Sequence, residues 1–381
     1  MRGRRAEAGD LADVLERGGV EVLAGGVVRE GRRAEGLDAA AHGASVPLPG
    51  ASRWPLAPPP HIGMITVVAA TGDPGPTGER NHIMTYDKLT VAVLGPGGVG
   101  GLLAALLAKA GHRVICLARE DTATALRTDG IQVRSAQFGT FTAHVEADTE
   151  LRAPADAVLI AVKQTALDDA LARVPAEVLG DALLVPFLNG VEHPATLRAH
   201  HRPELVAPGV IRVESTRTAP GVIEHASPFT EIDLSGDPVD PTRLEALAVV
   251  LNGAGPRTRV LGSETQALWA KLAFLAPFAL LTTRYALPVG DLRTAHRDEL
   301  TALVTEVAAI STAAGSAADP ARILARYDAL PGSMKSSMQR DAESGRPLEL
   351  DAIGGALLRA AGAYGVGAPV AERVVGELGA S

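Results

Sequence analysis

The stretch from Leu89 to Arg119, LTVAVLGPGGVGGLLAALLAKAGHRVICLAR, decides the fold of this chain. Residues 89–94 form a short apolar run rich in β-forming side chains, which is typical of a buried strand. An alanine- and leucine-rich stretch follows from Gly101 to Ala110, and Gly111 stands where a helix C-cap glycine is expected. Residues 114–118 predict a second strand. This order of strand, glycine turn, helix and strand predicts a βαβ unit.

The turn between the first strand and the helix has the spacing G-x-G-x-x-G. In such turns the first glycine allows the tight bend, the second lets a pyrophosphate approach the backbone, and the third lets the helix pack against the strand. The N–H groups and positive dipole end of the helix then hold the pyrophosphate. The alternative is a glycine-rich loop that binds nothing. The predicted dinucleotide-binding residues are Gly95, Pro96, Gly97, Gly98, Val99 and Gly100.

The end of the second strand predicts which dinucleotide binds. An acidic residue there hydrogen-bonds the ribose of NAD, whereas an arginine accommodates the 2′-phosphate of NADP. In this chain Arg119 comes first after the strand, and Glu120 follows it. We therefore predict NADP(H) as the cofactor. The alternative is that Arg119 is a solvated surface residue and Glu120 makes the selection.

Length and composition restrict the class of protein. The chain has 381 residues, 46% hydrophobic and 21% charged, which is enough for two domains with sizeable cores. The net charge of −8 gives no basic footprint, so neither a nucleic-acid nor a membrane partner is predicted. The one cysteine, Cys116, excludes an internal disulfide and is expected to be a buried core residue. A reducing, cytoplasmic setting fits, and no histidine spacing predicts a metal.

Residues 1–83 differ from the rest of the chain. The segment from Pro47 to Pro76 contains eight prolines and four glycines, a composition typical of disordered sequence. No apolar core of a signal peptide follows the first arginines. We expect a disordered extension, or upstream sequence translated from a wrongly placed start, because a start at Met84 leaves a natural length for two domains. A regulatory or partner-binding tail is the alternative.

Residues 84–262 continue the alternation of strands and helices. Further buried strands are predicted at residues 157–162 and 183–188, and they end at Lys163 and Asn189. This pattern predicts a Rossmann-type, doubly wound, mostly parallel sheet, in which ligands bind beyond the carboxyl ends of the strands. The glycine turn, Arg119, Lys163 and Asn189 all stand at such ends. Other predicted elements are edge strands at 131–133 and 143–145, helical spacing over 164–178, and short β segments between 205 and 234.

Residues 263–381 are predicted to form an all-helical domain. Glycines stand at the ends of several predicted helices and prolines at the beginnings of others, as is typical of helix termini. The apolar stretch Leu272–Leu281 is too short to span a membrane and lies between Lys271 and Arg284, so it is interpreted as part of a core helix. The predicted helices cover 264–285, 299–314, 320–327, 348–364 and 369–378.

Two charged residues in the helical region are candidates for chemistry. Lys271 lies within an apolar sequence, where a lysine is costly unless its amine reaches water or a partner. It is either a snorkelling lysine at the core edge or a general acid whose pKa is lowered by partial burial. Glu349 is either a first-turn acid that complements a helix dipole or a carboxylate that anchors a polar substrate.

In combination these motifs resemble the ketopantoate reductase family, the NADP-dependent 2-dehydropantoate 2-reductases. The resemblance covers nearly everything from Leu89 to Val374, and it implies a helical domain like the C-terminal domain of 6-phosphogluconate dehydrogenase. Ser337 and Glu349 stand at the spacing that the family also shows. The other matching pieces are the glycine turn, Arg119, Val162-Lys163, Asn189-Gly190-Val191-Glu192, Trp269-x-Lys271 and Glu349-x-Asp351.

The resemblance implies a reaction and roles for these residues. NADPH delivers hydride to the ketone carbon of a 2-oxo acid, and Lys271 protonates or polarises the developing alkoxide. Asn189 helps to place nicotinamide and substrate, while Ser337 and Glu349 hydrogen-bond the polar ends of the substrate. Such a site lies in a cleft between the domains that closes on binding. The residues implied to face the cofactor are Lys163 and Arg119.

One departure from the family bears on the substrate. The family usually has asparagines four and eight residues after the lysine, where this chain has Leu275 and Ala279, and Pro277 is expected to bend the helix nearby. Ketopantoate or a related 2-oxo acid is the first substrate class, and the resemblance implies a place in pantothenate and coenzyme A biosynthesis. A same-fold reductase of an unrelated ketone and an NADP(H)-binding sensor without catalysis are the alternatives, and a homodimer is left open.

Overall fold

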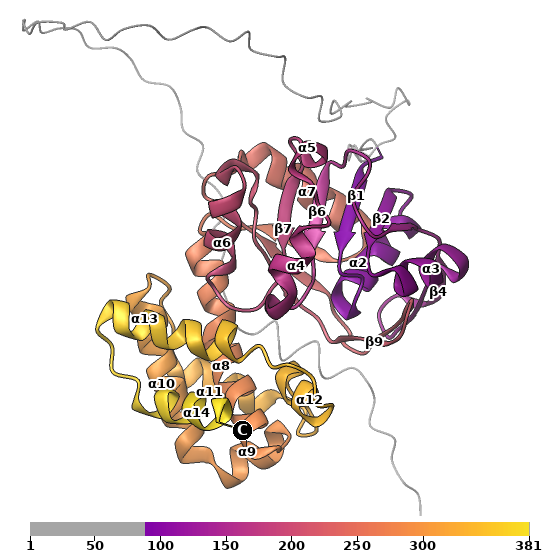
Figure 1. Cartoon of the computed structure of the whole chain (residues 1–381). Coiled ribbons are helices and arrows are strands. Elements are labelled where there is room, and N and C mark those ends of the chain that lie inside the picture. The colour runs from indigo at the N-terminus through magenta and orange to yellow at the C-terminus, as the bar shows by residue number, and fades with distance from the viewer. Residues whose placement is uncertain (1–87, 381) are drawn as a thin grey trace, which may run out of the picture. The chain divides into compact units, whose positions relative to one another are not determined.

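The computed structural model describes residues 88–380. The expected extension at residues 1–83 and the expected start at Met84 therefore lie outside the described residues. Within the described part, strands are interspersed with helices as far as β12, and only helices follow (Figure 1). This order confirms the predicted Rossmann-type α/β fold followed by an all-α region.

A parallel sheet of five strands forms the centre of the α/β part. Its order is β5-β2-β1-β6-β7, and each neighbouring pair runs in parallel. Because β1 lies in the middle, the turn that follows it opens at the centre of the carboxyl edge, where ligands bind in such sheets. The strands are β1 (Thr90–Leu94), β2 (Arg113–Leu117), β5 (Glu146–Asp148), β6 (Ala157–Ile160) and β7 (Leu183–Pro186).

Helices cover both faces of this sheet. Val91 and Val93 of β1 pack into one core with α2, α3 and α7, while Ala92 and Leu94 pack into a second core with α4, α5 and α6. Cys116 is fully buried in the first core, as its place in the sequence predicts. The helices are α2 (Gly98–Lys109), α3 (Glu120–Asp129), α4 (Leu167–Leu171), α5 (Ala176–Leu179), α6 (His193–His200) and α7 (Pro241–Ala254).

Two smaller sheets accompany the parallel sheet. One has the order β4-β3-β10-β9 and the other β12-β11-β8. The expected edge strand at 131–133 is instead paired on both sides, because β4 forms an antiparallel hairpin with it and β10 runs beside it. The expected strand at 143–145 is wrong, since β4 ends at Ala143 and β5 begins at Glu146. The strands are β3 (Ile131–Ser135), β4 (Gly139–Ala143), β8 (Gly209–Arg212), β9 (Ser215–Ala219), β10 (Val222–His225), β11 (Glu231–Leu234) and β12 (Arg257–Val260).

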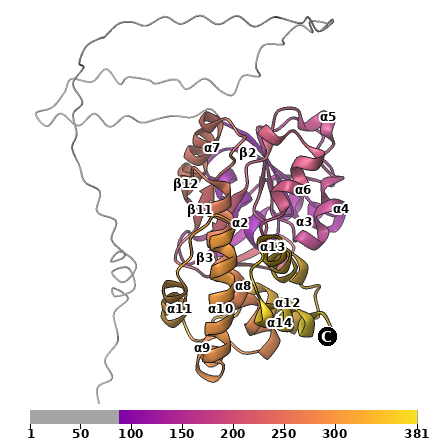
Figure 2. The ribbon, with the colours of Figure 1, turned by 90° about the vertical axis from the view of Figure 1, so that its left-hand side faces the viewer.

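The helical part packs around α8, which appears as the long central helix in Figure 2. It is continuous through Pro277. By length and composition α8 is apolar enough to cross a membrane, but 67% of its most apolar window is buried inside the protein. Its apolar side chains join the core of the helical part, as a core helix requires. The helices are α8 (Glu264–Tyr285), α9 (Val289–Ala295), α10 (Arg297–Ala313), α11 (Pro320–Ala329), α12 (Ser337–Glu343), α13 (Ala356–Tyr364) and α14 (Pro369–Gly379).

Several helices differ from the prediction in their limits. The predicted helix over 164–178 is broken into a 3₁₀ turn (Gln164–Ala166), α4 and α5, because Pro175 precedes α5 and provides no N–H for a continuous helix. The predicted helix over 348–364 contains a π-helical turn at Asp351–Gly355 before α13. Helices α6, α7, α9 and α12 were not predicted. Of these, α9 and α12 have seven residues each, too few for a clear apolar period.

Candidate active site

The glycine turn after β1 has the geometry that its sequence predicts. Gly95 has φ +86°, and a Cβ there would lie 2.6 Å from Cγ1 of Val162, so only glycine fits. A Cβ at Gly100 would lie 2.3 Å from the carbonyl oxygen of Gly95, which shows how closely α2 approaches the turn. Gly97 differs, because the nearest atom to its Cβ position is 3.9 Å away. The backbone is therefore open to a ligand at Gly97.

The start of α2 suits an anionic ligand beside that open position. The first turn of α2 has no acidic residue, and the first N–H groups of any helix lack intrahelical acceptors. Ser215 of β9 braces the turn, since its hydroxyl donates to the carbonyl oxygen of Gly98 over 2.8 Å. Pro96 is buried, while Val99 is half-buried. This arrangement fits a dinucleotide pyrophosphate.

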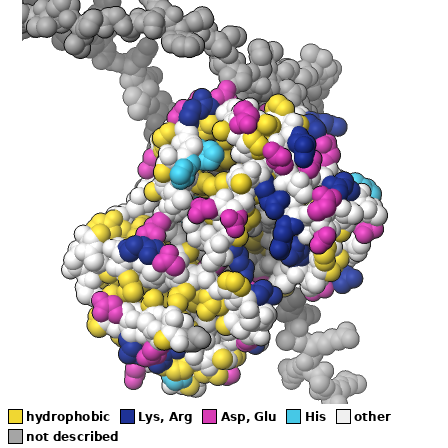
Figure 3. Space-filling model, viewed as in Figure 1, with side chains coloured by type: hydrophobic (Ala, Val, Ile, Leu, Met, Phe, Trp, Pro, Cys, Tyr) yellow, Lys and Arg dark blue, Asp and Glu magenta, His cyan; other side chains and the backbone are white. Residues whose placement is uncertain are grey.

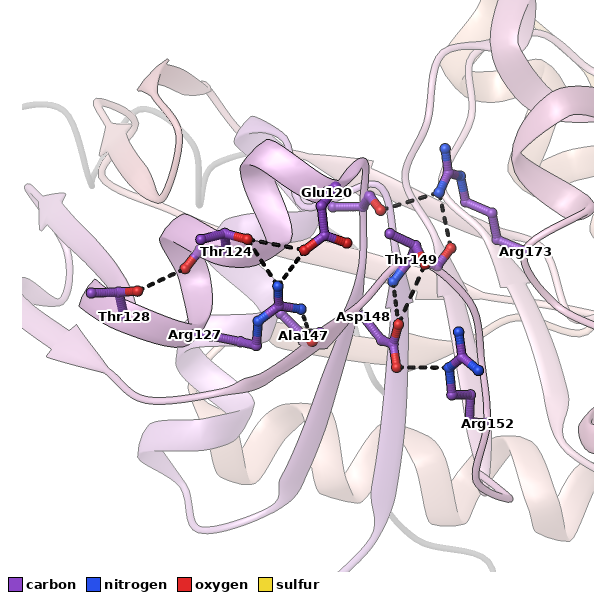
Figure 4. A network of polar contacts seen from close by, with 10 residues as sticks. Glu120, Thr124, Arg127, Thr128, Ala147, Asp148, Thr149, Arg152 and Arg173 are labelled. Atoms are coloured by element: carbon purple, nitrogen blue, oxygen red, sulfur yellow. Dashed lines mark hydrogen bonds and ion pairs between the residues drawn. The ribbon is translucent and has the colours of Figure 1, made fainter.

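Arg119 and Glu120 follow β2 and differ in their contacts. The Glu120 carboxylate accepts hydrogen bonds from Arg127 and from the Thr124 hydroxyl within α3, as Figure 4 shows. The hydrogen bond from Arg127 lowers the pKa of Glu120. The guanidinium of Arg119 is exposed and makes no hydrogen bond or ion pair with residues 88–380. Of these two side chains, the arginine is the one left free for a ligand.

Lys163 stands three residues after β6, at the carboxyl edge of the sheet. Its ammonium forms an ion pair of 2.6 Å with Asp341 of α12, which also accepts a hydrogen bond of 2.8 Å from Arg346. A second ion pair, between Glu214 and Arg340, joins the segment before β9 to α12. Lys163 thus tethers α12 to the α/β part as well as standing at the edge where a cofactor is expected. In the view of Figure 3, basic side chains gather over the region that Figure 1 labels α2 and α4.

Asn189 and Glu349 meet at the junction of the two parts of the chain. The Asn189 amide donates to Oε2 of Glu349 over 3.0 Å, and the backbone N–H of Gln164 donates to Oε1 over 3.0 Å. Glu349 is only 7% exposed. Gly190, with φ +88°, follows Asn189, and a Cβ there would lie 2.4 Å from the carbonyl oxygen of Ala352. The turn after β7 therefore packs directly against the π-helical turn that follows Glu349.

Lys271 lies on α8 beside this junction. It is half-buried, and its ammonium has no hydrogen-bond or ion-pair partner among residues 88–380. Burial lowers the pKa of Lys271 to about 8, the nearby Glu349 carboxylate opposes this shift, and Arg212 adds to it. A lysine with this pKa is mostly protonated at neutral pH and gives up its proton readily. Asn189 and Glu349 are thus in contact, and Lys271 lies within reach of the Glu349 charge.

The structure gives no hydrogen bond or ion pair between Ser337, the remaining predicted substrate-binding residue, and Asn189, Glu349 or Lys271 within the described residues. Ser337 is the exposed first residue of α12, whereas its neighbour Ser336 is buried and caps the helix by accepting from the Gln339 N–H over 3.0 Å. Leu275, half-buried, packs against the helical core, and Ala279 is fully buried within that core. Apolar packing thus occupies both positions where the family usually has asparagine.

Sequence reasoning missed two polar groups near Lys271, the buried His193 and the half-buried Arg212. His193, at the start of α6, is 1% exposed, and neither ring nitrogen has a hydrogen-bond partner in the described part of the chain. Burial lowers its pKa to about 3, with Lys271 and Arg198 adding to the shift, so the imidazole is neutral. Arg212, the last residue of β8, contributes to the low pKa of Lys271. No motif marks either residue, and only the packing of α6 and β8 against α8 reveals them.

A Rossmann-type sheet with an open glycine turn, followed by helices that present a lysine to its carboxyl edge, defines an oxidoreductase with a dinucleotide-binding fold. The family profile "Ketopantoate reductase PanE/ApbA" matches residues 91–235, and "Ketopantoate reductase PanE/ApbA C terminal" matches residues 265–380. The chain belongs to the ketopantoate reductase family. This confirms the resemblance seen in the sequence.

Individual relatives agree with this family. A 2-dehydropantoate 2-reductase of Caulobacter vibrioides is 29% identical over 303 residues, which cover 77% of this chain and 99% of that protein. The crystal structure of 2-dehydropantoate 2-reductase from Geobacter metallireducens is 30% identical, with a TM-score of 0.70, over 76% of this chain and 99% of that one. The ternary structure of D-mandelate dehydrogenase with NADH and anilino(oxo)acetate shares the fold, with a TM-score of 0.70 and 19% identity over 77% and 98% of the two chains.

Proposed function

We propose that this protein is an NADPH-dependent reductase of 2-oxo acids, with 2-dehydropantoate as the first candidate substrate. The observation that carries the proposal is the half-buried, unpartnered ammonium of Lys271 beside the Asn189–Glu349 hydrogen bond. When bound, NADPH supplies the hydride that reduces the ketone carbon. Lys271 donates a proton to the ketone oxygen as negative charge develops on it.

The other residues of the site bind and orient the substrate and the cofactor. Each oxygen of Glu349 accepts one hydrogen bond in the structure and can accept another, so the carboxylate suits a hydroxyl at the far end of the substrate. Asn189 fixes the orientation of Glu349 and adjoins the nicotinamide, and Ser337 contributes a hydroxyl from α12. The open backbone at Gly97 receives the pyrophosphate, and Lys163 lines the cofactor side of the site.

The preference for NADPH is supported by the contrast between two neighbouring residues. Glu120 is occupied by Arg127 and Thr124, whereas the Arg119 guanidinium is exposed and free among residues 88–380. An arginine in that place accommodates the 2′-phosphate of NADP, while NAD binding uses an acidic residue. D-mandelate dehydrogenase, whose ternary structure contains NADH, is 19% identical to this chain and supports the fold alone.

A second candidate is a reductase of the same fold that acts on a more apolar 2-oxo acid or ketone. Leu275 and Ala279 favour it, because a site without hydrogen-bonding partners discriminates weakly for polar groups on the substrate. The deciding experiment follows NADPH oxidation by the purified protein against a panel of 2-oxo acids that includes ketopantoate and acids with branched apolar side chains. We expect turnover with 2-oxo acids. Tight NADPH binding without turnover of any ketone would contradict the proposal and favour a sensor.

A further inference from the structure

One face of β8 is directed at the helical part of the protein. Val210 of this strand packs with Ala267 and Leu268 of α8. Because side chains alternate along a strand, Arg212 lies on the same face, two residues further on. Lys271 lies four residues after Ala267, one turn along the same face of α8. Arg212 is thereby placed beside the turn of α8 that carries Lys271.

Arg212 is fixed at one end of its guanidinium and free at the other. Its Nη2 donates to Oδ2 of Asp233 over 2.7 Å, and Asp233 is almost fully buried. Its Nη1 is buried but has no hydrogen-bond partner among residues 88–380. Oε2 of Glu231 lies 4.0 Å from Nη1, which is too far for a hydrogen bond. A buried donor without an acceptor is costly, so a ligand atom that accepts from Nη1 is expected.

The surroundings of Arg212 favour an anion. Arg212 lies close enough to Lys271 and to Arg326 for its charge to lower the pKa of both. Arg326 of α11 stands over the ring of Phe274, 4.3 Å from its centre, and forms no ion pair within the described residues. The Glu231 carboxylate forms an ion pair of 3.4 Å with Arg257, so it does not serve Arg212 alone. The group that best satisfies a free guanidinium N–H in this field is a carboxylate.

We propose that Nη1 of Arg212 binds the carboxylate of the substrate, next to the ketone that Lys271 protonates. This inference rests on the proposed function and adds a specificity-determining residue to it. In a 2-oxo acid the carboxylate and the ketone are adjacent carbons, so their two partners must also be neighbours. Arg212 on β8 and Lys271 on α8 meet that condition. The anchor replaces polar contacts that α8 does not provide at Leu275 and Ala279.

The proposal predicts selectivity for the acid group itself. An uncharged analogue of the same ketone, such as the amide of the acid, gains little from Arg212. The test compares 3-methyl-2-oxobutanoate with its amide, using the parent protein, Arg212→Gln and Arg212→Lys. The matched control is Arg259→Gln, because Arg259 also binds Asp233, over 2.7 Å, but lies on β12 with 61% of its side chain exposed.

We expect Arg212→Gln to raise KM for the acid roughly ten- to a hundredfold, the effect of one hydrogen bond to a charged group, with little change in kcat. KM for the amide and the affinity for NADPH should stay unchanged. Arg212→Lys should recover part of the loss, and Arg259→Gln should leave both substrates unaffected. An equal rise in KM for acid and amide, or the same rise in Arg259→Gln, would overturn the anchor. If Arg212→Gln does not fold, Arg212→Lys must still raise KM for the acid alone.

Binding of oxamate, an inert carboxylate, separates this inference from the proposed function. The measurement is calorimetric, on the protein saturated with NADPH. If the parent reduces no 2-oxo acid but binds oxamate through Arg212, the proposed reaction fails and the anchor stands. If the parent reduces 2-oxo acids and Arg212→Gln does so with unchanged KM, the reaction stands and the anchor is wrong. A parent that neither turns over nor binds oxamate contradicts both.

Discussion

Asn189 donates from its side-chain amide to Oε2 of Glu349 over 3.0 Å, across 160 residues of sequence. This bond joins the end of β7 to the segment that precedes α13. Since Gln164 donates to the other oxygen, the carboxylate is held in one orientation by groups from the α/β part. The Glu349 carboxylate of the helical part is therefore positioned by the part that carries the glycine turn.

Glu349→Gln should weaken the binding of hydroxylated substrates. A glutamine keeps the shape but replaces one acceptor oxygen with an amide donor, which meets the Asn189 amide or the Gln164 N–H unfavourably. We expect a higher KM for ketopantoate and a smaller change for a 2-oxo acid without a hydroxyl, measured by steady-state kinetics. Equal effects on both substrates would assign Glu349 a purely structural role.

Lys271→Ala should lower kcat by roughly 10²–10⁴-fold, the usual range for loss of a general acid. The affinity for NADPH, measured by fluorescence titration, should hardly change. Lys109→Ala serves as the control, because Lys109 lies in the last turn of α2 over the ring of Phe141. Normal turnover by Lys271→Ala would show that another group supplies the proton.

The pH dependence of reduction should reflect Lys271. In the proposed reaction the protonated form of Lys271 is the active one, and the pKa of Lys271 is about 8, lowered by burial and by Arg212 and raised by Glu349. We therefore expect kcat/KM for reduction to fall as pH rises through about 8. Glu349→Gln removes the charge that raises this pKa, so the fall should move to lower pH. A fall that moves upward in this variant would contradict the assignment.

Arg119→Ala should weaken NADPH binding much more than NADH binding, because only the 2′-phosphate loses a partner. Glu120→Gln is the matched variant at the next position. Since Glu120 is held by Arg127 and Thr124, we expect it to leave the NADPH preference in place. The measurement is the dissociation constant of NADPH and of NADH for the parent protein and for both variants. Equal weakening of both in Arg119→Ala would refute the role of Arg119.

Gly97→Ala and Gly98→Ala should separate binding from folding. A Cβ at Gly97 would have no atom closer than 3.9 Å, so the fold should be retained while the methyl group occupies the approach of the pyrophosphate. A Cβ at Gly98 would lie 2.2 Å from the backbone oxygen of Ser215, so β9 must shift and the melting temperature should fall. Thermal denaturation and NADPH titration of both variants test this contrast. An unchanged NADPH affinity in Gly97→Ala would contradict the pyrophosphate site.

The local patterns in the sequence predicted the parts of the fold that depend on neighbouring residues. The β1–α2–β2 unit and the long helix α8 follow from short apolar runs and glycine or proline punctuation. Lys163 and Asp341 pair across a long separation in sequence, which leaves no local signal. His193 and Arg212 were not predicted for the same reason. Each comes near Lys271 only through the packing of distant segments, and no local sequence pattern marks that proximity. The short helices α9 and α12 carry too few turns for a period.

Gly190 couples the geometry of the two parts of the chain. Its φ of +88° and a Cβ position 2.4 Å from the Ala352 carbonyl oxygen leave no room for a side chain. A larger residue would push the β7 turn away from the π-helical turn, and Asn189, the preceding residue, would move with it away from Glu349. A single methyl group at position 190 would thus be enough to separate the two halves of the candidate site.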